Sequence, residues 1–138
     1  MILGIGIDTT NVHRFTDWHK KSSEQLQKIF SLDEITYCLH ENKQTSAERF
    51  AARFAAREAF FKAYHAMCAQ LNIENKKTLL MVQKHTTVQR NKNGVPMLMI
   101  NWPALLPENI KAPNVHLSLT HTIEIATAMV LLEASQNQ

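Results

Sequence analysis

Two acidic side chains, Asp8 and Glu58, could together bind a divalent cation. Asp8 ends an apolar N-terminal segment, and Glu58 lies in an Ala-rich segment four residues before Lys62. If the two carboxylates share a site, their repulsion would keep one protonated unless a cation lies between them. Mg²⁺ is commonly held by one or two carboxylates with water and phosphates, and Lys62 would add a positive charge there. The spacing of Glu58 and Lys62 also fits an exposed ion pair, which the helix alone favours.

Two polar residues near the C-terminal end, Ser118 and His121, are further candidates. Ser118 lies in an alternating apolar and polar segment that His121 follows, so they could face a phosphate or be ordinary exposed strand positions. The sequence has no P-loop, no Gly-x-Gly-x-x-Gly fingerprint and no Gly-x-Ser-x-Gly elbow. None of the seven histidines belongs to a His-x-x-x-His pair, so a zinc site is not expected.

A long helix at residues 46–72 is expected to carry Glu58 and Lys62. The segment is rich in Ala and contains neither Gly nor Pro, the two residues that most disfavour a helix. At about 100° per residue, three aromatic residues share a stripe expected in the core: Phe50, Phe54 and Phe61. Three cations share a neighbouring face, which is expected to be solvated: Arg49, Arg53 and Arg57.

Residues 1–8 are expected to form the strand that positions Asp8. With a period of two, one face of the strand carries Leu3, Ile5 and Ile7. The other face carries Ile2, Gly4, Gly6 and Asp8. The chain has only three glycines, so we expect these two where the backbone passes close to something. That neighbour could be a packed strand or helix, a ligand beside Asp8, or both.

The remaining pattern predicts an α+β fold with one domain, residues 1–138. Helices are expected at 16–30 and from a capping box at Ser31 and Glu34 to Asn42, with a break at 44–46. Strands are expected at 79–88 and 95–100, joined by a turn at 91–94 that contains Asn-Gly. A proline-rich connection at 102–114, with one short helical turn, precedes strands at 115–119 and 123–133 and a frayed end at 134–138.

Bulk composition narrows the class of protein. The net charge of +3 is compatible with an acidic partner, but nucleic acid binding is not expected because no aromatic residues interleave with basic ones on strands. No apolar run has the length of a membrane span, and the N-terminus lacks a basic signal-peptide start. Cys38 and Cys68 have no metal-ligand spacing, so reduced core thiols and a cytoplasmic location are expected.

Taken together, the motifs resemble those of the holo-[acyl-carrier-protein] synthases, small trimeric 4′-phosphopantetheinyl transferases. The matching segments are Gly4–Asp8 with Arg14 and Phe15, residues 29–38, residues 50–63, Asn93–Pro96, and residues 116–121 followed by Ala126 and Ala128. The resemblance implies an antiparallel sheet wrapped around a long helix. It also implies a homotrimer with an active site at each subunit interface, which transfers 4′-phosphopantetheine from coenzyme A to an acyl-carrier-protein serine.

The resemblance also assigns roles to individual residues. Asp8 and Glu58 would bind Mg²⁺, which also grips the diphosphate of coenzyme A. Lys62, Ser118 and His121 would be polar members of the same site, and the nucleotide would lie along Arg53, Asn93, Gly94 and Pro96. The acidic carrier protein would dock on the basic segment that contains Arg14, Lys20 and Lys21. The base that deprotonates the acceptor serine stays open among Glu58, Asp33, Glu34 and His121.

The chain departs from the family pattern at several positions. Ala52 replaces the usual Gly, Arg57 replaces Lys, and Phe61 stands where a small residue is common. No Gly-x-Gly turn follows Ala63, although the family places that turn in the wall near coenzyme A. One alternative is therefore a relative that binds coenzyme A without turnover. Another is a basic structural or nucleic-acid-binding trimer that uses the arginine face.

Overall fold

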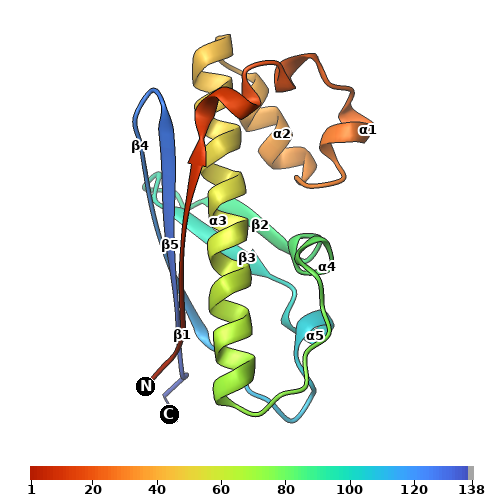
Figure 1. Ribbon diagram of the computed structural model, residues 1–138, viewed down its shortest axis with the longest axis vertical. Coiled ribbons are helices and arrows are strands. Elements are labelled where there is room, and N and C mark those ends of the chain that lie inside the picture. Colours follow the sequence, from red (N-terminus) through yellow and green to blue (C-terminus); the bar gives the residue numbers. More distant parts are fainter. Residues whose placement is uncertain (137–138) are drawn as a thin grey trace.

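A long helix packed on one face of an antiparallel sheet forms the centre of the protein (Figure 1). The computed structural model describes residues 1–136. Helix α3 (Lys43–Gln70) lies against strands β1 (Ile2–Asn11), β5 (Ile125–Glu133) and β4 (Asn114–His121). The strand order is β1-β5-β4, so β1 and β4 are the two edges of this sheet. The α+β class predicted from the sequence is confirmed.

Two glycines of β1 allow the strand to touch the backbone of α3. A Cβ atom at Gly6 would lie 1.9 Å from the carbonyl oxygen of Ala59, and one at Gly4 would lie 2.1 Å from that of Ala63. The close packing expected at these glycines is therefore confirmed, with a helix as the neighbour. The predicted face of β1 is wrong at Leu3, which is buried because the register shifts between Ile2 and Gly4.

A second, two-stranded sheet consists of β2 (Thr86–Arg90) and β3 (Pro96–Ile100). The turn between them has Gly94 at φ 78°, a backbone conformation that favours glycine, so the predicted hairpin is confirmed. Residues 79–83 were expected in the first of these strands but form helix α4 (Leu79–Gln83), because the Thr78 side chain caps a helical turn there. Helix α5 (Trp102–Leu105) is the short turn predicted in the proline-rich connection.

The segment before α2 is less regular than predicted. A 3-10 turn, η1 (Val12–Phe15), follows β1. In place of one helix at 16–30 the chain then forms a second 3-10 turn, η2 (Trp18–Lys20), and one turn of α-helix, α1 (Ser23–Leu26). Ser22 caps α1, as one reading of the sequence allowed. The rest of the segment follows tertiary packing, because the Trp18 ring packs against the rings of Phe15, Phe30 and Phe50.

Helix α2 (Leu32–Leu39) begins with the predicted capping box, in which Ser31 and Glu34 satisfy each other's backbone amides. It ends three residues earlier than expected. Asn42 then caps α3 by accepting a hydrogen bond from the amide of Thr45, so the break predicted at 44–46 is absent and α3 begins at Lys43. The aromatic stripe is also partly wrong: Phe50 is fully buried, but Phe54 and Phe61 are half-buried, while Phe60 lies in the core.

The first strand and the last described residues lie close together (Figure 1). The amide of Ala134 donates to the carbonyl oxygen of Met1, and the Ser135 hydroxyl donates to that of Ala112, so these two residues are held rather than frayed. The last two positions of the predicted frayed end, 137–138, lie outside the described residues. No helix found within residues 1–136 is both long and apolar enough to cross a membrane.

Candidate active site

Asp8 is held by two neighbours where β1 runs beside α3. The Lys62 ammonium lies 3.2 Å from Asp8 Oδ1 and also donates to the carbonyl oxygen of Ile7 at 2.8 Å. On the other side, the hydroxyl of Thr10 donates to Asp8 Oδ2 at 2.9 Å. Lys62 thus pairs with Asp8. The helix spacing alone favours a different pair, between Lys62 and Glu58.

Glu58 faces the same cluster from one helical turn before Lys62. The side chain is half-buried, and burial raises the pKa of its carboxyl above the ordinary value. The nearby charge of Asp8 raises that pKa further, while Lys62 and Arg14 oppose the rise. The fold therefore brings the two predicted carboxylates into one electrostatic environment, which we call the acidic cluster: Asp8, Glu58, Lys62 and Thr10.

The donor set of this cluster suits a hard divalent cation. Two carboxylates from different elements face a shared region, and the Asp8 charge adds to the cost of ionising Glu58. A cation between them would remove that cost. Within residues 1–136 no group of three or more His, Cys, Asp or Glu side chains is placed to hold a metal. A cation here would therefore rely on water and substrate oxygens for its other ligands, as Mg²⁺ commonly does.

A cleft of about 420 Å³ carries a second group of predicted residues, among them Arg53, Pro96 and His121. Three guanidinium groups surround the Tyr37 ring there, with carbons 4.0, 4.2 and 5.2 Å from its centroid: Arg49, Arg53 and Arg90. His121 Nδ1 lies 3.6 Å from a Glu48 carboxylate oxygen at the rim. Because this arginine cleft combines cations with an aromatic face, it suits a phosphorylated ring compound.

The two groups of residues lie toward opposite edges of the main sheet. In the register of the sheet, Thr10 pairs with Ala126 and Ala126 pairs with His121, so Asp8 and His121 belong to the two edge strands. Thr10 and His121 are therefore two strand spacings apart, about 10 Å. Asp8, Glu58 and Lys62 are not among the described residues that line the arginine cleft.

Ser118 and the hairpin turn lie outside both groups. Ser118 pairs with Met129, which pairs with Ile7, so it belongs to the sheet face turned away from α3. Asn93 and Gly94 are exposed in the turn, and only Pro96 of that segment reaches the cleft.

The arginine face of α3 is not solvated, which corrects the sequence-based expectation. Arg57 is 1% exposed and donates to both carboxylate oxygens of Glu34 and, at 2.9 Å, to the carbonyl oxygen of Thr86. Glu34 also accepts from the backbone amide of Ser31 at 3.0 Å and from the Thr87 hydroxyl at 2.9 Å. These bonds tie α2, α3 and β2 together, so Glu34 is a structural residue and not an available base.

The predicted docking residues lie together on the surface of the irregular N-terminal segment. The Arg14 guanidinium stacks 5.0 Å from the Phe54 ring, and Lys21 lies 5.3 Å from the Trp18 ring. Lys20 is 3.0 Å from Asp17, an exposed pair. Arg14 also lowers the pKa of Glu58, so this one residue of the basic surface acts on the acidic cluster.

Comparisons with known proteins identify the family. Residues 4–103 match the 4′-phosphopantetheinyl transferase superfamily. The chain belongs to that superfamily. The holo-[acyl-carrier-protein] synthase of Treponema denticola is 34% identical over 134 residues, which cover 96% of this chain and 99% of that protein. The enzyme of the same name from Cytophaga hutchinsonii is 36% identical, with 95% and 97% covered.

A solved structure extends the likeness of this transferase to three dimensions. The crystal structure of a holo-(acyl-carrier-protein) synthase from Bacillus anthracis str. Ames, in complex with CoA (3′,5′-ADP), superposes with a TM-score of 0.72 at 27% identity. The match covers 98% of this chain and 99% of the other. The resemblance inferred from the motifs is therefore confirmed over nearly the whole chain.

Three features of the transferase were missed by reasoning from the sequence. Thr10 lies two residues after Asp8, so the period of β1 places both side chains on one face, and this signal was available. Tyr37 and Arg90 complete the arginine cleft from α2 and β2. Tyr37 and Arg90 come close to Arg53 only in the folded protein, so their spacing in the sequence does not predict that they share a cleft.

Proposed function

We propose that this transferase moves 4′-phosphopantetheine from coenzyme A to a serine of an apo-acyl-carrier protein and releases adenosine 3′,5′-bisphosphate. The observation that carries the proposal is the acidic cluster, because Asp8 and Glu58 share one environment next to the Lys62 ammonium. The similarity to holo-[acyl-carrier-protein] synthases over nearly the full chain supports the choice of substrates. We treat residues 1–138 as one catalytic domain.

Asp8 and Glu58 would hold Mg²⁺. When bound there, the cation would neutralise charge on the diphosphate of coenzyme A. Lys62 is 52% exposed at its side chain, so it can turn from Asp8 to a phosphate oxygen and stabilise the charge that develops on the leaving group. Thr10 keeps Asp8 in place while Lys62 moves, because its hydroxyl bonds the other carboxylate oxygen.

The arginine cleft would receive the nucleotide part of coenzyme A. Arg49, Arg53 and Arg90 supply positive charge for its phosphates, and the Tyr37 ring holds these guanidinium groups together. The hairpin residues Asn93, Gly94 and Pro96 would lie along the nucleotide, and Ser118 and His121 would add polar contacts. The acceptor serine must lose its proton, for which Glu58, Asp33 and His121 are the candidate bases.

A homotrimer would bring the two groups together. The sheet face turned away from α3 exposes large apolar side chains that a partner subunit would cover: Ile5, Ile7, Ile125 and Met129. In a closed ring, the β1 edge of one subunit meets the β4 edge of the next. The acidic cluster of one subunit and the arginine cleft of its neighbour would then form one active site at each interface.

The acceptor would be an acidic carrier protein docked on the exposed basic surface of Arg14, Lys20 and Lys21. Arg14 acts on the pKa of Glu58, which supports docking close enough to the acidic cluster for a carrier serine to reach the diphosphate. A cytoplasmic location agrees with the two cysteines, which are free and buried. Burial raises the pKa of the Cys38 thiol to about 12, which keeps it protonated and unreactive.

The proposal is tested by incubating the purified chain with Mg²⁺, coenzyme A and a panel of apo-carrier proteins, read by intact mass. Asp8→Ala is expected to abolish the mass increase that corresponds to phosphopantetheine while the oligomer stays folded. Glu74→Ala, which removes an exposed carboxylate paired with Lys76, is the matched control. Full transfer by Asp8→Ala would reject the assignment.

A relative that binds coenzyme A without turnover is the second candidate. It is favoured by one observation: α3 continues without interruption to Gln70 through the segment where the family has Gly-x-Gly. Calorimetric titration with coenzyme A separates the two, because binding without transfer to any carrier supports only the second candidate.

A further inference from the structure

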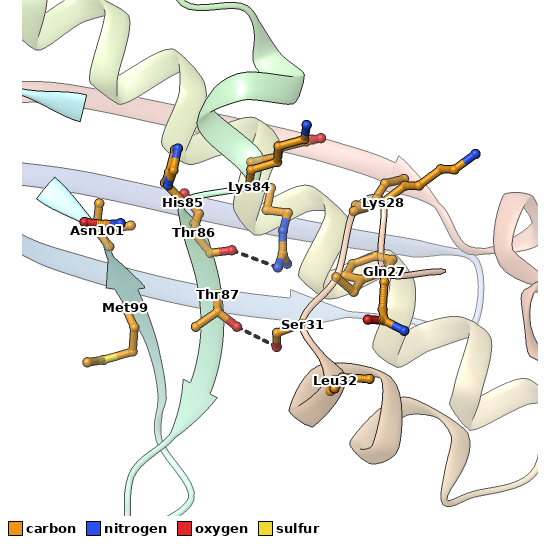
Figure 2. A pocket seen from close by; sticks show the side chains of 15 residues that line it. Gln27, Lys28, Ser31, Leu32, Lys84, His85, Thr86, Thr87, Met99 and Asn101 are labelled. Atoms are coloured by element: carbon orange, nitrogen blue, oxygen red, sulfur yellow. Dashed lines mark hydrogen bonds between the residues drawn. The ribbon is translucent and has the colours of Figure 1, made fainter. Parts of the chain in front are cut away.

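A cavity of about 550 Å³ lies apart from both groups of the proposed active site. Its walls come from three chain segments and from the Arg57 side chain of α3 (Figure 2). It shares no residue with the acidic cluster or the arginine cleft. One wall is the connection from α1 to α2, residues 27–32. The opposite wall is the end of α4 with the start of β2, residues 83–87, and a third is the end of β3, residues 99–101.

Two buried nitrogen atoms in the wall have hydrogen-bonding capacity that the protein does not use. Gln83 is 3% exposed and Arg57 is 1% exposed. Within residues 1–136, neither Gln83 Nε2 nor Arg57 Nε has a hydrogen-bond partner. Buried N–H groups are almost always paired, so two unpaired donors on residues that line one cavity mark this wall as unusual.

The charge of the walls selects the kind of acceptor. Among the described residues that line the cavity there is no Asp or Glu, whereas four are basic: Lys28, Arg57, Lys84 and His85. Arg57 is balanced by Glu34, but Lys28 and Lys84 are exposed and free to face a ligand at the rim. Lys28 extends outward from that rim in Figure 2, opposite the β2 wall that carries Thr86 and Thr87.

Apolar side chains make up much of the remaining surface. They are Ile29, Phe30, Leu32, Met99 and Ile100. Leu32 and Met99 are exposed, which is costly unless something covers them. A cavity of this size with a few convergent polar groups on an apolar wall is typical of a small-molecule site.

We propose that this cavity binds a small organic anion with an apolar tail, of the kind represented by a medium-chain carboxylate. The carboxylate faces the Lys84 ammonium, and the Gln83 amide turns into the cavity to donate a hydrogen bond to it. The tail lies along Phe30, Leu32 and Met99. Because the ligand spans from the α1–α2 connection to β2, it stabilises the end of the basic N-terminal segment.

The test uses sodium octanoate as the probe and the whole purified chain. Thermal melting and ¹⁵N–¹H chemical shifts are followed as octanoate is added, with inorganic phosphate and 1-octanol as probes of the head and the tail alone. Octanoate is expected to raise the melting temperature saturably and to shift the amides of residues 27–32 and 83–87. Inorganic phosphate and 1-octanol should each bind at least about tenfold more weakly than octanoate. Saturating coenzyme A should not compete, which separates this site from the proposed active site.

Two variants and one control decide the outcome. Gln83→Met keeps the volume but removes the amide donor, and Lys28→Glu with Lys84→Glu reverses the rim charge; each should weaken octanoate about tenfold. Lys76→Glu with Lys111→Glu makes the same charge change at exposed positions outside the cavity and should leave binding unchanged. Equal affinity in rim and control variants, or shifts confined to the outer face of the main sheet, would overturn the proposal. If Gln83→Met does not fold, the exposed rim variant decides alone.

Discussion

At the scale of single residues, Asp8 and Glu58 differ in how the protein compensates their charge. Asp8 accepts a hydrogen bond from Thr10 and pairs with Lys62. Glu58 is half-buried, and burial followed by the charge of Asp8 raises its pKa. The folded chain therefore carries one carboxylate whose ionisation opposes folding, as expected where a bound cation supplies the missing charge.

Glu58→Gln should make the protein more stable and less active. A raised carboxyl pKa in the folded state means that the charged form destabilises the fold above the unfolded pKa, so the neutral amide removes this cost at neutral pH. We expect the melting temperature to rise by up to about 3 °C and Mg²⁺-dependent transfer to fall by about 10²-fold or more. Glu74→Gln should change neither quantity. A less stable but active Glu58→Gln protein would contradict this account of the cluster.

The same residue predicts how activity depends on pH. Since metal binding needs the ionised carboxylate, the transfer rate should fall as the pH falls through the raised pKa of Glu58. The acidic limb should therefore lie above the ordinary carboxyl range, and saturating Mg²⁺ should move it to lower pH. Initial rates at a series of Mg²⁺ concentrations measure this shift. An acidic limb that does not respond to Mg²⁺ would assign it to a different group.

The buried pair of Arg57 and Glu34 predicts a large effect on stability. Burial alone would raise the pKa of Glu34, but Arg57, with the hydrogen bonds from Ser31 and Thr87, lowers it below its ordinary value of 4.5. This stabilisation is present above that value and is lost as the pH falls through the lower folded pKa. Arg57→Met should cost about 3–5 kcal/mol at neutral pH, because it leaves a buried charge unpaired.

Replacing both partners is the control for that prediction. Glu34→Leu with Arg57→Met should recover much of the lost stability, because no unpaired charge remains in the core. Urea unfolding at a series of pH values from 7 to well below 4.5 measures both quantities. The double variant should also lose the part of the pH dependence that comes from Glu34. If it is as unstable as Arg57→Met alone, the loss comes from packing and not from the unpaired charge.

At the scale of elements, the sequence predicted helix starts and turns best where the residues that determine them are neighbours in the chain. The capping box at Ser31 and the Asn-Gly turn both act within a few residues, and both predictions are confirmed. The burial of Arg57 could not be predicted in this way, because its partner Glu34 comes from a different helix. The prediction of one helix at 16–30 was wrong for the same reason, since the Trp18 ring packs against Phe30 and Phe50, which lie far along the chain.

The contact between β1 and α3 controls where Asp8 lies. Gly6→Ala would place a Cβ atom 1.9 Å from the Ala59 carbonyl oxygen, so the strand must move away from the helix. We expect a loss of about 1–3 kcal/mol in the free energy of unfolding and a loss of transfer that added Mg²⁺ does not restore. Gly94→Ala, where φ is 78° but the space is open, should cost only about 1 kcal/mol and leave β1 in place. A fully active Gly6→Ala enzyme would show that the position of Asp8 tolerates this shift.

At the scale of the whole molecule, the two edges of one sheet have different chemistry. The β1 edge carries the acidic cluster, and the β4 edge borders the arginine cleft. One subunit keeps these groups about two strand spacings apart, whereas the proposed ring of three subunits would give every interface one of each. The exposed apolar face of the sheet gives the subunits a reason to associate. This arrangement makes a prediction that a site confined to one chain does not make.

Subunits with complementary defects should restore activity to one another. Asp8→Ala lacks the acidic cluster, and Arg53→Ala lacks part of the arginine cleft, so each is expected to be inactive alone. After the two are mixed in equal amounts and unfolded and refolded together, an interface is intact only when its cluster comes from Arg53→Ala and its cleft from Asp8→Ala. Random assembly makes about a quarter of the interfaces intact, so about a quarter of the wild-type transfer rate should return. Refolding each variant separately before mixing is the control, and it should give no activity unless subunits exchange. If co-refolding restores nothing while size-exclusion chromatography shows mixed trimers, both groups belong to one subunit's site and the interfacial arrangement is wrong.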